Sequence, residues 1–119
     1  MKKNICLIGA GRMGALHANH ISKSKYGKLH SVVDINTKRG SDIAGNYGVK
    51  FYRSTQEALL DPSLNAVSIS TNTPYHADLI IESAKMGKAI LCENPIDISV
   101  ENTTKALQAV KKSRVAFLV

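Results

Sequence analysis

The stretch that decides the fold is Ile5-Cys6-Leu7-Ile8-Gly9-Ala10-Gly11-Arg12-Met13-Gly14. A short apolar run, typical of a buried strand, leads into the pattern G-x-G-x-x-G, and a helical pattern begins at Arg12. Glycines at these three positions allow a tight turn, a close approach of the backbone to a pyrophosphate, and close packing of helix on strand. The backbone N–H groups and the helix dipole would then face phosphates. The alternative is an incidental glycine-rich turn without a ligand.

An acidic residue follows the turn at the spacing expected for a dinucleotide site. Asp34 ends the next predicted strand, 20 residues after Gly14, and a separation of about 20 residues is typical. Its carboxylate can accept hydrogen bonds from both ribose hydroxyls of an adenosine and would repel a 2′-phosphate, which favours NAD over NADP as the cofactor. Arg39 lies close enough in sequence to offset part of that repulsion, or it is simply a solvated helix residue.

The rest of the chain alternates apolar runs with segments of helical period. The runs predict strands over residues 4–8, 29–34, 50–52, 66–70, 89–92 and 115–119. Helix starts are indicated by Arg12, by the caps Asn36, Ser54 and Ser99, and by Thr73 as an N-cap before Pro74 in a first turn. This alternation predicts an α/β fold: a Rossmann-type, doubly wound parallel sheet of about six strands with helices on both faces.

Periodicity also predicts which side of each helix faces the core. In the first helix the spacing selects Met13, Leu16, His17, His20 and Ile21. In the fourth it selects Ala77, Ile80, Ile81 and Ala84, and in the last it selects Val100, Leu107 and Val110. The histidines of the first helix read as packing or capping residues. No histidine pair has the setting of a metal site, so none is expected.

Composition excludes several classes of protein. The 119 residues fit one domain with its own core. The formal net charge is +7, with ten Lys and Arg against three acids in residues 1–60. These cations are scattered and not interleaved with aromatics, so they suggest a small anionic ligand and not nucleic acid. No apolar run is long enough to span a membrane. Cys6 and Cys92 each lie within an apolar run, which fits a cytoplasmic location with reduced thiols and does not suggest nucleophiles.

Three stretches together resemble one family of oxidoreductases. They are residues 5–14 with His17 and Asp34, residues 66–76 (Ala-Val-Ser-Ile-Ser-Thr-Asn-Thr-Pro-Tyr-His), and residues 91–96 (Leu-Cys-Glu-Asn-Pro-Ile). The pattern is similar to the glucose-fructose oxidoreductase/inositol dehydrogenase family, Gfo/Idh/MocA, over essentially the whole chain. Within that family the resemblance is greatest to its inositol 2-dehydrogenases. It implies hydride transfer between a polyol or sugar C–OH and NAD.

The resemblance also implies roles for individual residues. Ser70, Thr71 and Asn72 would lie beside the dinucleotide at the switch point of the sheet, and Glu93 would lie near the nicotinamide. Pro95 would follow a cis peptide bond, and His76 either faces the ligand or packs within its helix. The full set expected to bind the cofactor is Gly9, Gly11, Arg12, Met13, Gly14, Asp34, Arg39, Ser70, Thr71, Asn72, His76 and Glu93.

The chain departs from the family pattern in two ways. Family members carry Glu-Lys-Pro in the third stretch, where this chain has Asn94, which has no titrating group, so the catalytic residues stay unassigned. Members also continue into a second domain that holds the substrate. We therefore expect residues 1–119 to be a truncated cofactor half, inactive alone and self-associating near residues 115–119, with a substrate only where a second domain is present. The alternatives are a stand-alone, non-catalytic dinucleotide-binding or regulatory module, or a fragment without a physiological role.

Overall fold

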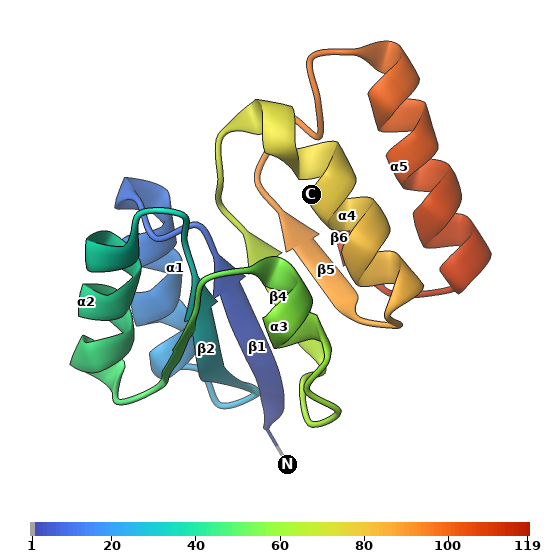
Figure 1. Cartoon of the computed structure of the whole chain (residues 1–119). Coiled ribbons are helices and arrows are strands. Elements are labelled where there is room, and N and C mark those ends of the chain that lie inside the picture. Colours follow the sequence, from blue (N-terminus) through green and yellow to red (C-terminus); the bar gives the residue numbers. More distant parts are fainter. Residues whose placement is uncertain (1) are drawn as a thin grey trace.

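The computed structural model describes residues 2–119, and its centre is a parallel sheet with strand order β3-β2-β1-β4-β5-β6 (Figure 1). The strands are β1 (Lys3–Ile8), β2 (Gly27–Val33), β3 (Lys50–Tyr52), β4 (Ala66–Ile69), β5 (Ala89–Cys92) and β6 (Phe117–Leu118). The helices are α1 (Arg12–Ser22), α2 (Thr37–Tyr47), α3 (Thr55–Leu59), α4 (His76–Lys85) and α5 (Val100–Ser113), with a short 3₁₀ turn, η1, at Thr73–Tyr75. The predicted Rossmann-type architecture of six strands is confirmed.

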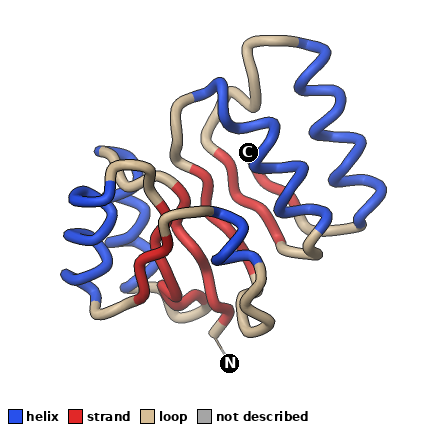
Figure 2. The backbone as a smooth tube through the Cα atoms, in the orientation of Figure 1, coloured by secondary structure: helices blue, strands red, loops and turns tan. Residues whose placement is uncertain are grey.

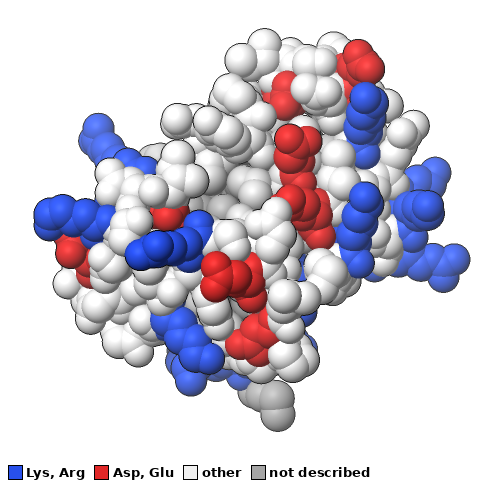
Figure 3. Space-filling model, in the orientation of Figure 1, with Lys and Arg blue, Asp and Glu red and all other residues white. Residues whose placement is uncertain are grey.

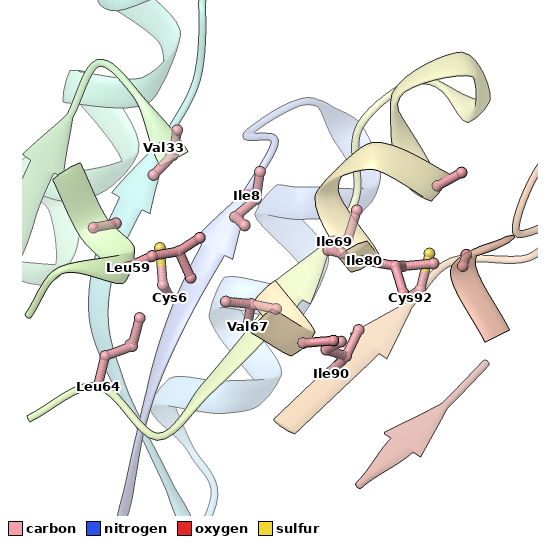
Figure 4. Close-up of a cluster of buried hydrophobic side chains, with 14 residues drawn as sticks. Cys6, Ile8, Val33, Leu59, Leu64, Val67, Ile69, Ile80, Ile90 and Cys92 are labelled. Atoms are coloured by element: carbon pink, nitrogen blue, oxygen red, sulfur yellow. The ribbon is translucent and has the colours of Figure 1, made fainter. Parts of the chain in front are cut away.

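Both faces of the sheet are covered, as Figure 2 shows by the helices on either side of the strands. On one face α1 and α2 pack on β1 and β2 around Leu7, Leu29 and Val32. On the other face α3 and α4 pack on β1, β4 and β5 around Val67 and Ile69, in the cluster drawn in Figure 4. Helix α5 packs against α4. The chain thus winds outward from β1 in one direction and from β4 in the other, so β1 and β4 border the switch point.

Three of the predicted helix caps are confirmed. Side-chain oxygens of Asn36, Ser54 and Ser99 accept hydrogen bonds from backbone N–H groups in the first turns of α2, α3 and α5. The prediction that Thr73 caps the fourth helix is wrong. The N–H of Tyr75 donates to the carbonyl of Asn72 at 3.1 Å, so the tighter η1 turn precedes α4 and places Thr73 inside it.

The helix faces were predicted only in part. Met13 and Leu16 are each 45% exposed, whereas Gly14 and Ala18 are the buried residues of α1. The helix lies so close to the sheet that small residues must occupy the contact, and large apolar residues are pushed to its flanks. In α5, likewise, Ala106 is buried while Val100 is exposed. The predicted face of α4 holds better, because Ala77, Ile80 and Ala84 are buried there.

The last strand is shorter than the predicted residues 115–119. Only Phe117–Leu118 forms β6, which pairs with β5 in parallel register. Leu7, Ser68, Leu91 and Leu118 are register partners across neighbouring strands, on the face of the sheet that carries α1. Leu91 and Leu118 are exposed there.

Within residues 2–119, none of the helices has the length and apolarity needed to cross a membrane.

Candidate functional site

The turn between β1 and α1 requires glycine at two positions for packing reasons. Gly9 has φ +97°, and a Cβ there would lie 2.7 Å from the carbonyl carbon of Ser70. A Cβ on Gly14 would lie 2.0 Å from the carbonyl oxygen of Gly9. Gly11 differs, since a Cβ there would meet only the Arg39 side chain, at 3.7 Å. Gly9 lets the turn pack against the segment after β4, and Gly14 lets α1 pack against the turn. Gly11 leaves open space beside the turn.

The N-terminus of α1 has no side-chain cap. Gly11 occupies the cap position in an extended conformation, and no side chain bonds to the first-turn N–H groups. By contrast, α2, α3 and α5 each have a side-chain cap. The exposed Arg12 adds a positive charge to this first turn. Uncapped N–H groups at the positive end of a helix dipole form a ready site for an anion such as a phosphate.

Asp34, just beyond the end of β2, is tied to the same turn. One carboxylate oxygen accepts from the Ala10 N–H at 2.9 Å, and the other accepts from the Asn36 N–H at 2.8 Å. The side chain is nearly fully buried. Burial alone would raise the pKa of the Asp34 carboxyl. The hydrogen bonds from Arg39, Asn36 and Ala10 outweigh burial and hold that pKa below its usual value.

Arg39 pairs directly with Asp34, which the sequence left open. Arg39 donates from Nε to Oδ2 of Asp34 at 2.9 Å and from Nη2 to Oδ1 at 3.1 Å, a two-point contact. The guanidinium also lies over Gly11, at the mouth of the turn. Together with Ala10 and Asn36, Arg39 fills the acceptor positions of the carboxylate. A ribose hydroxyl can therefore bond to Asp34 only where Arg39 gives up one of its contacts.

A cleft of about 680 Å³ opens where β1 and β4 end. It is lined by nine of the predicted cofactor residues: Gly9, Gly11, Arg12, Met13, Asp34, Arg39, Ser70, Thr71 and Asn72. Figure 3 shows this face of the molecule hollowed near its middle, with acidic side chains gathered around the middle and most Lys and Arg toward the edges. The cleft thus lies at the carboxyl edge of the sheet, where ligands of open α/β folds bind.

Sequence reasoning missed the far wall of this cleft. Residues 53–56, from the end of β3 into α3, and Tyr75, Asp78, Leu79 and Glu82 from η1 and α4 also line it. The Gln56 amide donates to the Glu82 carboxylate at 3.0 Å and so joins the two segments. One available signal was that residue 53 directly follows β3, so it lies at the same sheet edge as Asp34. The contribution of α4 depends on how that helix is tilted, which periodicity does not report.

His76 lies outside the cleft, although the sequence offered it as a possible ligand contact. The side chain is buried, with Nδ1 2.8 Å from the Pro95 carbonyl oxygen and Nε2 2.8 Å from the Thr71 carbonyl oxygen. The Asn94–Pro95 bond is cis, as the family resemblance implied. His76 therefore packs within the fold, where it joins the segment after β4 to the segment after β5. Its ring is not among the groups that line the cleft.

Gly14 and Glu93 also lie outside the cleft lining, and Asn94 is exposed. Glu93, just beyond β5, contacts His17 of α1.

Burial raises the pKa of the Cys6 thiol to about 12, and burial together with the charge of Glu93 raises the pKa of the Cys92 thiol to about 12. Both thiols are buried and protonated at neutral pH, so neither is an activated nucleophile. Within the described residues, no cluster of His, Cys, Asp and Glu could hold a metal ion.

These features define a class of protein. A glycine-rich strand-to-helix turn, an uncapped helix N-terminus and a carboxylate at the end of β2 meet in one cleft at the switch point of a parallel sheet. This is the arrangement of a dinucleotide-binding Rossmann domain.

Comparison with known proteins gives the family. The family described as "Oxidoreductase family, NAD-binding Rossmann fold" (Gfo/Idh/MocA) matches residues 3–119, and the chain belongs to it. It is 37% identical over 114 residues to the uncharacterized oxidoreductase YrbE of Bacillus subtilis, covering 95% of this chain and 33% of that protein. It is 37% identical over 113 residues to inositol 2-dehydrogenase of Rhizobium meliloti, covering 95% and 34%.

A solved structure shows the same similarity. A putative myo-inositol dehydrogenase from Sinorhizobium meliloti 1021 superposes with a TM-score of 0.93 at 35% sequence identity, covering 98% of this chain and 35% of that one. Over residues 3–119 the chain thus has the NAD-binding Rossmann fold of this family, and it is similar in sequence and structure to inositol dehydrogenases. It spans about a third of the length of the curated relatives it matches.

Proposed function

We propose that the cleft binds NAD with its pyrophosphate on the turn from Gly9 to Gly14 and its adenosine ribose beside Asp34. The observation that carries the proposal is the uncapped first turn of α1, which faces the same cleft as the Asp34 carboxylate. The helix terminus attracts the phosphates, and the carboxylate accepts a hydrogen bond from a ribose hydroxyl in place of one of its two contacts with Arg39. Ser70, Thr71 and Asn72 line the cleft beyond β4, where the second half of the dinucleotide would lie.

The proposed preference is for NAD over NADP. A 2′-phosphate on the adenosine ribose would lie beside Asp34, whose low pKa keeps it charged at neutral pH. Two anions in contact repel each other, which disfavours NADP. Arg39 acts in the opposite direction, because its guanidinium already lies next to Asp34 and could pair with a phosphate. Asp34 is the more buried of the two and is held by three residues, so its charge is proposed to decide the preference.

Calorimetric titration with NAD and NADP tests this proposal. We expect NAD to bind about tenfold tighter than NADP or more, which corresponds to roughly 1.4 kcal/mol. We expect Asp34→Ser to reduce or reverse that ratio, because it removes the repelling charge, and Gly45→Ala to leave it unchanged. Gly45 lies on α2, and a Cβ added there would have nothing within 4 Å, so it serves as the matched control. Equal or tighter binding of NADP by the unchanged chain would contradict the role given to Asp34.

Where a second, substrate-holding domain is present, we propose hydride transfer between a polyol or sugar C–OH and the nicotinamide ring. The cofactor supplies that chemistry, and the residues of this domain bind and orient it. Proton transfer from a substrate hydroxyl needs a titrating group, which the exposed Asn94 does not provide. We therefore propose that residues 1–119 alone turn over no substrate. Asn94 also favours a second candidate function, a dinucleotide-binding module without catalysis.

Two further features bear on how the domain exists in the cell. We infer a homo-oligomer, because Leu91 and Leu118 leave an exposed apolar surface on the α1 face of β5 and β6. We infer a cytoplasmic location, in which Cys6 and Cys92 stay reduced.

A further inference from the structure

Four hydrogen bonds fill the carboxylate of Asp34. Its Oδ2 accepts from the backbone N–H of Ala10 and from Nε of Arg39, both at 2.9 Å. Its Oδ1 accepts from the backbone N–H of Asn36 at 2.8 Å and from Nη2 of Arg39 at 3.1 Å. A carboxylate has about four lone-pair positions, so no acceptor position is left over. A ribose that binds at Asp34 must therefore replace bonds that are already present.

The two bonds from Arg39 are the ones that can be exchanged. Ala10 belongs to the turn after β1 and Asn36 is the cap of α2, so the fold fixes both backbone N–H groups. The Arg39 side chain is 49% exposed, and within residues 2–119 its guanidinium donates only to Asp34. A ribose has two adjacent hydroxyl groups, and each can take the place of one Arg39 contact. The two backbone bonds to Asp34 then stay as they are.

The guanidinium that the ribose displaces lies next to the phosphate-binding turn. Nη1 of Arg39 is 3.7 Å from the position of a Cβ on Gly11, the cap residue of α1. Arg39 and Gly11 line the same cleft. An arginine pairs with phosphate oxygens through the same fork of N–H groups that it offers to a carboxylate. Rotation of the half-exposed side chain is therefore enough to move Arg39 from Asp34 to a phosphate at the turn.

We propose that Arg39 is a switch that couples phosphate binding at the turn to ribose binding at Asp34. Without phosphate at the turn, Arg39 pairs with Asp34 and excludes the ribose. Phosphate at the turn binds the guanidinium, and Asp34 then accepts the ribose hydroxyls. The inference rests on the proposed function and adds regulation to that site, because the cleft selects adenosine that carries phosphate over free adenosine. The coupling is reciprocal, since a ribose at Asp34 also frees Arg39 for phosphate.

Arg39→Met tests the switch, because it keeps an unbranched apolar stem and removes the charge and the donors. We expect adenosine to bind this variant about fivefold tighter than the unchanged chain, since two acceptor positions of Asp34 become free. We expect NAD to bind it about fivefold weaker, since the pyrophosphate loses a charged partner. The amide NMR signals of Ala10 and Asn36, whose N–H groups bond to Asp34, follow adenosine binding, and calorimetry follows NAD. A variant that merely folds poorly would lose affinity for both ligands.

Two further variants serve as controls. Lys38→Met removes the same charge from the neighbouring position of α2, where Lys38 is 86% exposed, pairs with Asp42 and does not line the cleft. Both affinities should change less than about twofold there, because salt screens an exposed charge outside the site. Arg39→Lys keeps the charge but not the fork that contacts both carboxylate oxygens. It should bind adenosine more tightly than the unchanged chain and keep most of the affinity for NAD.

Inorganic pyrophosphate gives an independent test of the coupling. At saturating pyrophosphate the unchanged chain should bind adenosine about fivefold tighter than without it, and Arg39→Met should show no such gain. The inference is overturned if Arg39→Met weakens adenosine and NAD alike, if it leaves adenosine binding unchanged, or if pyrophosphate does not strengthen adenosine binding. If the unchanged chain does not bind NAD, the proposed function fails and this inference fails with it. NAD binding without the opposite changes in Arg39→Met overturns the inference alone.

Discussion

Replacing Gly14 with alanine is expected to lower the free energy of unfolding by about 3 kcal/mol or more, because overpacking costs of this size arise where backbone must move. The new Cβ would lie 2.0 Å from the Gly9 carbonyl oxygen and 2.9 Å from its carbonyl carbon. Neither atom belongs to a flexible side chain, so α1 must move away from β1. Denaturant unfolding followed by circular dichroism measures the loss.

The same substitution at Gly45 provides the control. Gly45 lies in α2, where nothing is within 4 Å of an added Cβ and the backbone is helical. Alanine there should raise the free energy of unfolding by about 0.5–1 kcal/mol through helix propensity. Opposite signs at the two positions would support the packing described for α1. A Gly14→Ala variant as stable as the unchanged chain would show that α1 does not approach the turn so closely.

Gly11→Ala is expected to weaken NAD binding about tenfold or more while the domain stays folded, since losing a hydrogen bond to a charged phosphate costs roughly 1.5–3 kcal/mol. The space around a Cβ on Gly11 is open except for the Arg39 guanidinium, at 3.7 Å. The methyl group would stand above the uncapped N–H groups of α1, where the pyrophosphate must approach them. Titration calorimetry with NAD measures the loss.

Thermal unfolding of Gly11→Ala should differ little from that of the unchanged chain, because alanine at a helix cap in place of glycine costs about 1 kcal/mol or less. The two variants should therefore differ in what they change: Gly14→Ala lowers the free energy of unfolding, whereas Gly11→Ala weakens NAD binding. NAD affinity unchanged by Gly11→Ala would mean that the phosphates do not lie against this turn.

Much of the fold follows from local sequence signals. The apolar runs, the caps Asn36, Ser54 and Ser99, and the glycine at residue 48 with its φ of +64° each act within a few residues. The predicted turn and Asp34 do meet in one cleft, since the carboxyl ends of parallel strands share an edge. The spacing of these features along the chain was enough to place them.

Tertiary contacts determined what the sequence could not show. Close approach of α1 to the sheet put Gly14 and Ala18 inside and left Met13 exposed, against the periodicity of large apolar residues. The pairing of Arg39 with Asp34 depends on how α2 is set on the sheet. The burial of His76 depends on two segments that are distant in sequence. None of these contacts can be predicted from the spacing of residues within a short stretch of the sequence.

The most direct test of NAD binding at this cleft is an amide NMR titration of the ¹⁵N-labelled chain with NAD. We predict that the largest shift changes fall on residues 9–14, which form the phosphate turn, and on Ser70, Thr71 and Asn72 beyond β4. The amides of α5, which packs on α4 and does not line the cleft, should change little. Shift changes concentrated on α5, or none at any residue of the turn at saturating NAD, would contradict binding at this cleft.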